Sequence, residues 1–92
     1  MAIVTLRYWA AAKEAAGTAE ETITAGTLAE ALAAARGHAG QGEHPGQDSR
    51  LRAILARSSF LIDGMPVGTR APEAVVLSDA AVIEVLPPFA GG

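Results

Sequence analysis

Residues 81–88 read Ala-Val-Ile-Glu-Val-Leu-Pro-Pro and are the most informative segment for the fold. Its β-branched residues predict a strand over residues 81–86, with Ile83 and Val85 on one face and Glu84 on the other. The two prolines cannot donate ladder hydrogen bonds, so the strand ends where they begin. Only four residues follow the second proline, and the chain therefore leaves the sheet with a short tail.

The start of the chain supplies a second strand. Residues 3–9 are rich in β-branched and aromatic side chains, which predicts a strand. Residues 10–16 are alanine-rich and predict a short helix that ends at Gly17. Residues 19–24 predict another strand, and because the link back to the first strand is short, we expect the two strands to be antiparallel neighbours.

The next segment carries the clearest helix signal. Thr27 and Glu30 have the spacing of a capping box, which predicts the start of a helix. Apolar residues then recur at helical spacing, which predicts one buried stripe made of Leu28, Ala31, Leu32 and Ala35. The helix is expected to end near Gly37. Residues 37–47 hold four glycines and a proline, which predicts a flexible surface loop.

A second helical segment is expected after that loop, with Asp48 or Ser49 as its N-cap. Its inward-facing residues are predicted to be Leu51, Ile54 and Leu55. Its cations predict a charged helix face, formed by Arg50, Arg52 and Arg57 together with Asp48.

The remaining elements complete one small domain. Residues 59–63 predict a strand that turns at Asp63 and Gly64 towards residues 65–67. The order of elements predicts a single α+β domain over residues 1–88, followed by a flexible tail of residues 89–92. A chain of 92 residues has no room for a second core.

Composition excludes several classes of function. Cysteine is absent, which excludes disulfides, thiolate metal sites and a catalytic thiol in this chain. The net charge of -3 and the scattered Lys and Arg residues argue against a nucleic-acid partner. No apolar run is long enough for a membrane span, and no signal peptide is visible, so we expect a cytoplasmic protein.

Trp9 and Leu86 fall on strand faces that also carry the charged residues Arg7 and Glu84. Two interpretations remain open. Helices cover both apolar side chains, as they cover most large apolar groups, or the two form an exposed patch for a partner, where tryptophan is a favoured anchor.

The tail consists of Phe89, Ala90, Gly91 and Gly92. Glycine has no Cβ, so such an end fits a narrow channel, and four extended residues reach up to ~14 Å. A free α-carboxyl has a pKa of ~3.3–3.7 and is a poor electrophile at neutral pH, so it reacts only after activation. Conversion to an acyl-adenylate supplies the leaving group. A diglycine end is by itself a weak signal, because termini are often disordered.

In its context the tail is specific. The stretch from Glu84 to Leu86, followed by Pro87-Pro88 and Phe89-Ala90-Gly91-Gly92, resembles the end of the MoaD/ThiS family of sulfur carriers. Within that family the chain resembles most the branch that forms the small subunit of molybdopterin synthase. The resemblance spans nearly the whole chain and includes residues 60–64. It implies a ubiquitin-like β-grasp, in which a mixed sheet packs on one main helix with short additional helices.

The resemblance also implies a function and partners. Gly92 would carry an adenylate and then a thiocarboxylate that donates sulfur in molybdopterin synthesis. The partners would be a MoeB/ThiF-like adenylyltransferase that uses ATP, a persulfide sulfur donor and a MoaE-like large subunit. The chain itself would bind no cofactor and supply no catalytic residue beyond its own end. Trp9, Pro66 and Leu86 fall at partner-facing positions of the family. The chain departs from the family pattern at residues 78–81 and in the glycine-rich loop.

Three alternatives stay open. The chain carries sulfur for thiamine or another metabolite, or it modifies proteins through Gly92, or it is an interaction module that docks through Trp9 and Leu86. The remaining polar residues suggest no other site. His38 and His44 lack carboxylate neighbours, so we expect them to be solvated and predict no metal site.

Overall fold

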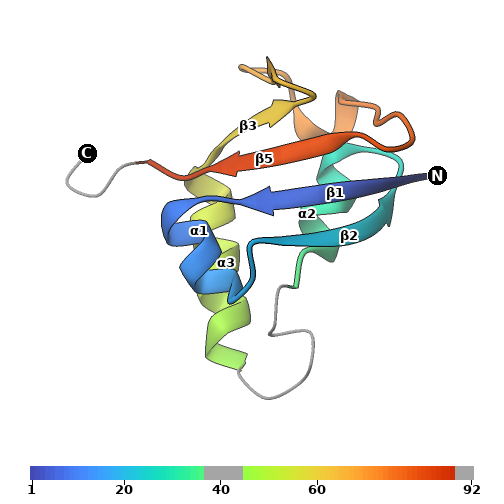
Figure 1. Cartoon of the computed structure of the whole chain (residues 1–92). Helices are drawn as coiled ribbons and strands as arrows, with labels where there is room; N and C mark the ends of the chain where they lie inside the picture. Colours follow the sequence, from blue (N-terminus) through green and yellow to red (C-terminus); the bar gives the residue numbers. More distant parts are fainter. Residues whose placement is uncertain (37–44, 89–92) are drawn as a thin grey trace.

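The computed structural model describes residues 1–36 and 45–88, with only the backbone of residues 45–49. Five strands form one mixed sheet in the order β2-β1-β5-β3-β4, in which β1 and β5 are parallel and the other pairs antiparallel (Figure 1). The elements are β1 Ala2–Tyr8, α1 Ala10–Ala16, β2 Glu20–Ala25, α2 Leu28–Ala34, α3 Pro45–Arg57, β3 Ser59–Ile62, β4 Met65–Pro66, the 3-10 helix η2 Pro72–Ala74 and β5 Val82–Leu86.

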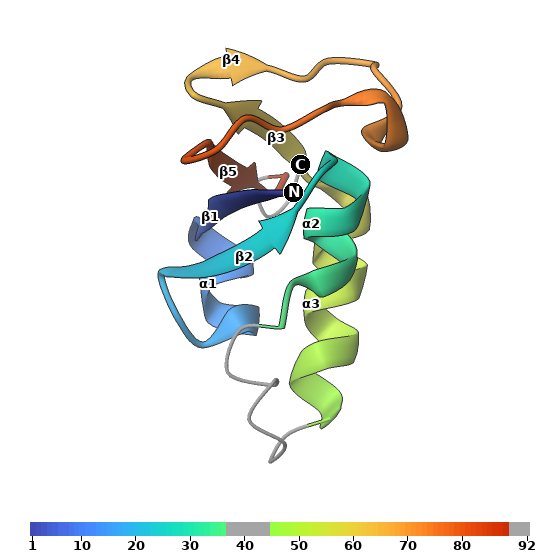
Figure 2. The same ribbon diagram turned by 90° about the vertical axis from the view of Figure 1, so that its right-hand side faces the viewer.

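The predicted α+β class is confirmed, and the helices lie on one side of the sheet. Figure 2 shows α2 and α3 together on one side of the strands, at the right of the view. α3 has 13 residues and α2 has 7, so the capped helix is the shorter of the two. The predicted antiparallel pairing of the first two strands is also confirmed, with Val4 opposite Ile23.

Strand alternation sorts the side chains into a covered and an open face. Leu6 is 0% exposed and Tyr8 1%, and in the neighbouring β5 both Ile83 and Val85 are 0% exposed. These residues pack against the buried stripe of α2 and the inward side of α3, where Leu51, Ile54 and Leu55 are buried as predicted. The core thus consists of two sets of apolar residues that pack together. One set lies at every second position of the strands, and the other lies at helical spacing along α2 and α3.

The predicted end of α1 and the predicted start of α2 are confirmed, whereas α2 ends at Ala34 and not near Gly37. Gly17 ends α1 in the left-handed conformation, with φ of 75°, and its N–H donates to the Lys13 carbonyl at 2.9 Å. Glycine adopts this conformation without the steric cost that a Cβ would add. At α2 the Thr27 hydroxyl accepts from the Glu30 N–H at 3.2 Å, and the Glu30 carboxylate accepts from the Thr27 N–H at 3.1 Å.

The turn between β3 and β4 is also as predicted. Asp63 and Gly64 have φ of 49° and 83°, which is the pattern of the two-residue hairpin turn that Asp-Gly favours. The Asp63 carboxylate accepts from the Val82 N–H at 3.0 Å and so joins the hairpin to the start of β5.

The predicted start of the second helical segment is wrong. α3 begins at Pro45, so Asp48 and Ser49 lie inside the helix and do not cap it, and residues 45–47 do not belong to a loop. Proline suits the first helical position, because its φ is already near the helical value and its missing N–H would have no helical acceptor. The rest of the predicted loop, residues 37–44, lies outside the described residues.

The predicted charged face of α3 is wrong at Arg52. Arg50 and Arg57 are exposed, whereas the Arg52 guanidinium turns towards the end of α2. It donates to the Ala33 carbonyl at 2.8 Å, to the Ala35 carbonyl at 2.7 Å and also to the Leu32 carbonyl. The last carbonyls of a helix have no partner within it, and α2 ends in an extended residue without a glycine cap. Arg52 supplies the missing donors.

A second polar contact holds β2 against β1. The Tyr8 hydroxyl donates to the Glu21 carboxylate at 2.5 Å, and the Arg36 N–H donates to the same oxygen at 2.8 Å. Burial, reinforced by the hydrogen bond to the Glu21 carboxylate, raises the pKa of the Tyr8 hydroxyl well above its usual value. The hydroxyl therefore stays protonated over the whole physiological range.

Candidate functional site

The predicted reactive end of the chain begins where β5 ends. β5 is an inner strand, paired with β1 on one side and β3 on the other. The last bond on the β1 side runs from the Trp9 N–H to the Val85 carbonyl at 3.3 Å. Pro87 is half-buried and Pro88 exposed, and neither has an N–H with which to extend the ladder. The proposed site residues Phe89, Ala90, Gly91 and Gly92 lie outside the described residues.

The open face of the sheet lies next to this exit. The strand registers place Arg7 of β1 opposite Glu84 of β5, Glu84 opposite Leu61 of β3, and Leu61 opposite Pro66 of β4. This row therefore crosses four strands on the face away from the core. With strands ~4.8 Å apart it spans about 14 Å.

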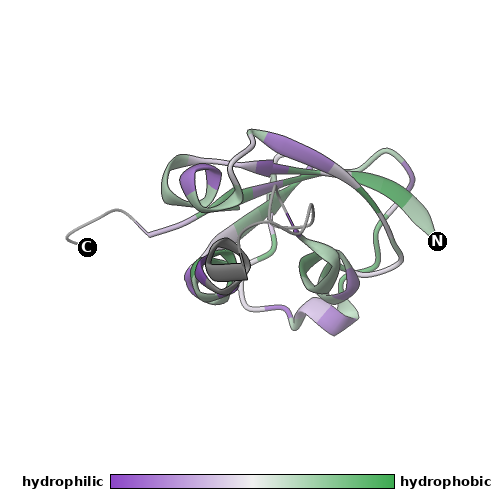
Figure 3. Ribbon diagram, turned by 90° about the horizontal axis from the view of Figure 1, so that it is seen from below, coloured by the Kyte–Doolittle hydropathy of each residue, from purple (hydrophilic) through white to green (hydrophobic). Residues whose placement is uncertain are grey.

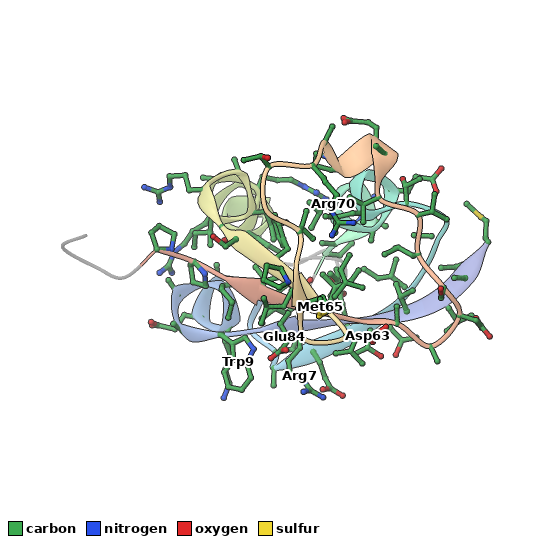
Figure 4. The ribbon with its side chains drawn as sticks, turned by 90° about the horizontal axis from the view of Figure 1, so that it is seen from above. Arg7, Trp9, Asp63, Met65, Arg70 and Glu84 are labelled. Carbon is green, nitrogen blue, oxygen red and sulfur yellow. The ribbon has the colours of Figure 1, made fainter. Side chains whose placement is uncertain are left out.

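Trp9 and Leu86 begin the next row towards the exit. Tyr8 of β1 is paired with Val85 of β5, and Trp9 and Leu86 are the residues that come directly after this pair. On the other side of β5, Leu86 is paired with Ser59 of β3. Trp9 is 45% exposed and Leu86 is half-buried. Figure 4 shows Trp9 projecting away from the sheet. The interpretation in which helices cover Trp9 is therefore wrong, and the interpretation in which it stays exposed is confirmed.

A hydrogen bond orients the Trp9 side chain. Its indole N–H donates to the Glu84 carboxylate at 3.2 Å, across the parallel pair of strands. The Arg7 guanidinium in turn lies 3.5 Å from the Glu20 carboxylate, both side chains being about half exposed. Such an exposed ion pair contributes little to stability, so these groups serve mainly to give the face its charge pattern.

The open face is thus a charged row bordered by apolar side chains. Trp9 and Leu86 lie on the side of the exit, and Leu61 and Pro66 lie at the β3–β4 end of the row. Pro66 is exposed and Leu61 half-buried. An aromatic anchor within mixed polar and apolar surroundings is typical of protein interfaces. Trp9, Leu86 and Pro66 therefore share one face, as a partner-binding surface requires.

Sequence reasoning missed Leu61 as part of this face. Phe60, Leu61 and Ile62 are all apolar, so the segment shows no alternation that would tell its two faces apart. Only the pairing of Leu61 with Glu84 assigns it to the open side. Figure 3 shows apolar residues in the first half of β1, next to the N-terminus.

Metal groups and membrane spans are two further features that we searched for in the described part of the chain. Residues 1–36 and 45–88 hold no group of three His, Asp or Glu side chains that could bind a metal. His38 and His44, which we expect to be solvated, lie outside these ranges. Among the described helices none has the length and hydropathy to cross a membrane.

Solved structures show what this chain is similar to. The small archaeal modifier protein 1 from Methanosarcina acetivorans matches with a TM-score of 0.77 and 22% identity, over 100% of this chain and 98% of that one. A putative molybdopterin converting factor subunit 1 from Pyrococcus furiosus matches with a TM-score of 0.70 and 17% identity, over 97% of this chain and 100% of that one.

A third structure, a complex of subunits 1 and 2 of the molybdopterin-converting factor from Helicobacter pylori, matches with a TM-score of 0.63 and 22% identity, over 98% of this chain and 99% of that one. No protein-family model and no curated protein matches the sequence. The similarities confirm the predicted ubiquitin-like β-grasp fold, which this chain shares with subunit 1 of the molybdopterin-converting factor.

Proposed function

We propose that this protein is a ubiquitin-like sulfur carrier that works through the carboxylate of Gly92. The observation that carries the proposal is the exit of the chain. An inner strand ends at Pro87-Pro88 beside an exposed tryptophan, in a fold shared with molybdopterin converting factor subunit 1, and the sequence then ends in Gly91-Gly92. Residues 1–88 act as the body that partners recognise, and residues 89–92 act as the reactive tail.

The proposed chemistry activates a poor electrophile. A carboxylate oxygen of Gly92 attacks the α-phosphorus of ATP in a partner adenylyltransferase, and pyrophosphate leaves. A persulfide sulfur of the donor protein then attacks the acyl carbon, and AMP leaves. A further thiol of the donor protein cleaves the sulfur–sulfur bond, which leaves a thiocarboxylate on Gly92 and a disulfide on the donor. Dividing one difficult substitution into easier steps is the general advantage of covalent intermediates.

The open face supplies the recognition surface in this proposal. Trp9, Leu86 and Pro66 would contact a MoeB/ThiF-like adenylyltransferase and a MoaE-like large subunit. The similar Helicobacter pylori structure is a complex of subunits 1 and 2 of the molybdopterin-converting factor, which supports a two-subunit assembly for this chain as well. The receiving pathway would be molybdopterin synthesis in the cytoplasm, with thiamine synthesis as the nearest alternative.

A second candidate function is protein modification through Gly92. The name of the Methanosarcina acetivorans neighbour, small archaeal modifier protein 1, favours it. Lys13 is the only lysine of this chain, so a modifier that also linked its own copies through lysine side chains would link them at one position. That property makes the two functions separable by experiment.

The test is the intact mass of the chain isolated from its native host. A carrier is expected to end at Gly92 and to contain a fraction in which one terminal oxygen is replaced by sulfur. Deletion of Gly92 is expected to abolish sulfur transfer in a reconstituted reaction and to leave the thermal midpoint nearly unchanged. Transfer that persists after the deletion would refute the mechanism.

The same preparation distinguishes the modifier function from the carrier function. Conjugates of the chain with other proteins would support modification, and conjugates between copies should disappear in Lys13→Arg. A sulfur-containing end without conjugates supports the carrier. Reconstitution with a molybdopterin-synthase or a thiamine-pathway acceptor then distinguishes the two pathways.

A further inference from the structure

A cavity lies at the β3–β4 edge of the sheet, where Leu61 and Pro66 of the open face form part of its lining. It has a volume of about 380 Å³ and lies between β3 with the residue before it and the segment of residues 66–72. Its apolar walls include Phe60, Val67 and Pro72, and its polar lining includes Ser59, Thr69 and Arg70. Arg70 is the only charged residue of the lining, so the cavity combines apolar walls with one positive charge.

The Arg70 guanidinium is held in place by the backbone beneath it. Its Nε donates to the Val67 carbonyl at 3.0 Å, and its Nη2 donates to the Pro66 carbonyl at 3.3 Å. A guanidinium has five N–H donors in a fixed planar fork, and these two bonds use one edge of it. Within residues 1–36 and 45–88 no carboxylate forms an ion pair with Arg70. The outer pair of N–H groups, on Nη1 and Nη2, therefore remains for a ligand.

The backbone adds a further donor to the same cavity. The Val67 N–H donates to the Phe60 carbonyl at 3.0 Å, while the Val85 carbonyl, opposite Phe60, accepts from β1 on the other side of β5. In antiparallel pairs the ladder bonds alternate, so Phe60 and Val85 exchange none with each other. The Phe60 N–H thus points away from β5, towards residues 66–72, as its carbonyl does.

We propose that this cavity binds an organic carboxylate with an apolar substituent. The outer edge of the Arg70 guanidinium would take both carboxylate oxygens, a geometry that arginine favours for this group. The apolar substituent would pack against Phe60, Val67 and Pro72. A single guanidinium matches the single charge of a carboxylate, and the apolar walls disfavour a phosphate dianion, because one cation leaves half of that charge uncompensated.

The cavity meets the open face at Leu61 and Pro66, but its charged group lies on the other side of the sheet from Trp9. Figure 4 shows Arg70 on the side of the helices, whereas Trp9 and Arg7 project from the opposite side. A ligand at Arg70 would therefore lie apart from Trp9 and Arg7. The carboxylate has two possible sources, a free small molecule or the C-terminal carboxylate of a polypeptide, and both present the same chemistry to the guanidinium.

The experiment is a titration of the full chain, followed by its amide resonances, with four probes. Phenylacetate and the peptide acetyl-Phe-Ala-Gly-Gly carry a carboxylate, and phenylacetamide and the peptide amide are their uncharged counterparts. We expect saturable shifts from the acids, largest at Phe60, Val67, Thr69 and Arg70, and none from the amides. Tighter binding of the peptide acid assigns the site to a polypeptide end, and tighter binding of phenylacetate assigns it to small molecules. Acids and amides that bind equally, or no saturable shift, overturn the proposal.

Variants locate the charge that binds. Arg70→Gln is expected to weaken binding of the acids at least tenfold, and Arg70→Lys, which keeps the charge but loses the fork, to weaken it less. Arg57→Gln removes an exposed cation that does not line the cavity and serves as the matched control, with unchanged affinity expected. Thermal midpoints near that of the parent chain show that each variant folds. Equal loss in Arg57→Gln and Arg70→Gln would show that net charge alone attracts the acids.

Discussion

The two faces of the sheet are built from the same strands and differ in almost every respect. In β1 the residues of the covered face, Val4, Leu6 and Tyr8, are at most 1% exposed, while Arg7 between them is exposed. The covered face is apolar apart from the Tyr8 hydroxyl, and the open face carries charges with apolar borders. A shift of one residue along a strand therefore moves a side chain from the core to the surface.

The contrast between the two faces indicates where stability and recognition are located. Buried apolar area dominates folding free energy, so the covered face should set the stability of the domain. The open face has little to contribute to folding, and its composition can be selected for a partner. Substitutions on the two faces should then have opposite profiles, one lowering the free energy of unfolding and the other lowering affinity.

The largest effect on stability is expected for Leu6→Ala on the covered face. Leu6 is 0% exposed, and truncation removes its apolar contacts and leaves a cavity. The free energy of unfolding in urea should fall by about 3 kcal/mol, within the range for such changes in cores. Leu61→Ala, on the open face, is the matched control and should cost less than ~1 kcal/mol. Similar losses at both positions would contradict the division between the faces.

The next effect is expected for Arg52→Ala, which tests the helix layer behind the covered face. The substitution removes three hydrogen bonds to carbonyls at the end of α2. Because hydrogen bonds of a charged group are stronger than neutral ones, the free energy of unfolding should fall by ~2 kcal/mol. Arg50→Ala removes an exposed arginine of the same helix and should change it little. If both variants unfold alike, Arg52 is an ordinary surface cation.

A smaller effect on stability and a large effect on binding are expected for Trp9→Ala. If Trp9 anchors a partner, affinity for the enzyme that copurifies with the native chain should fall by ~2 kcal/mol, about 30-fold. Val76→Ala is the control, because Val76 is 79% exposed but belongs to none of the five strands. Calorimetric titration measures the dissociation constant of each variant for the partner. An unchanged dissociation constant for Trp9→Ala removes the open face from the binding surface.

The smallest effect concerns pH and the single tyrosine. The pKa of Tyr8 is raised in the folded state, so its contribution to stability is complete below the unfolded pKa and is lost as pH rises beyond it. Between pH 8 and pH 11 the free energy of unfolding should therefore fall by ~1.4 kcal/mol on account of Tyr8, given an unfolded pKa of ~10. Tyr8→Phe should lack this part of the decline. Urea unfolding at several pH values measures the free energy of unfolding of both proteins. An equal decline with pH in the parent chain and in Tyr8→Phe would contradict the prediction.

Much of the fold could be predicted from local signals. The capping box at Thr27, the glycine that ends α1 and the Asp63-Gly64 turn each act through neighbouring atoms, so their residue types suffice to identify them. Alternation along β1 and β5 likewise separated the residues into the two faces of which the structure shows one to be buried. The tail residues Phe89 to Gly92 were assigned from sequence and resemblance alone, and their proposed role stays a prediction.

The sequence determined the elements, the buried stripes and the diglycine end, because each depends on residues close together in the chain. Contacts between distant segments place Arg52 against α2, Leu61 beside Trp9 on the open face, and Arg70 over a cavity beside Phe60. These facts depend on strand register and helix packing between segments far apart in sequence. No local pattern encodes them, since the same arginine or leucine fits a surface, a cap or an interface equally well until its neighbours are in place.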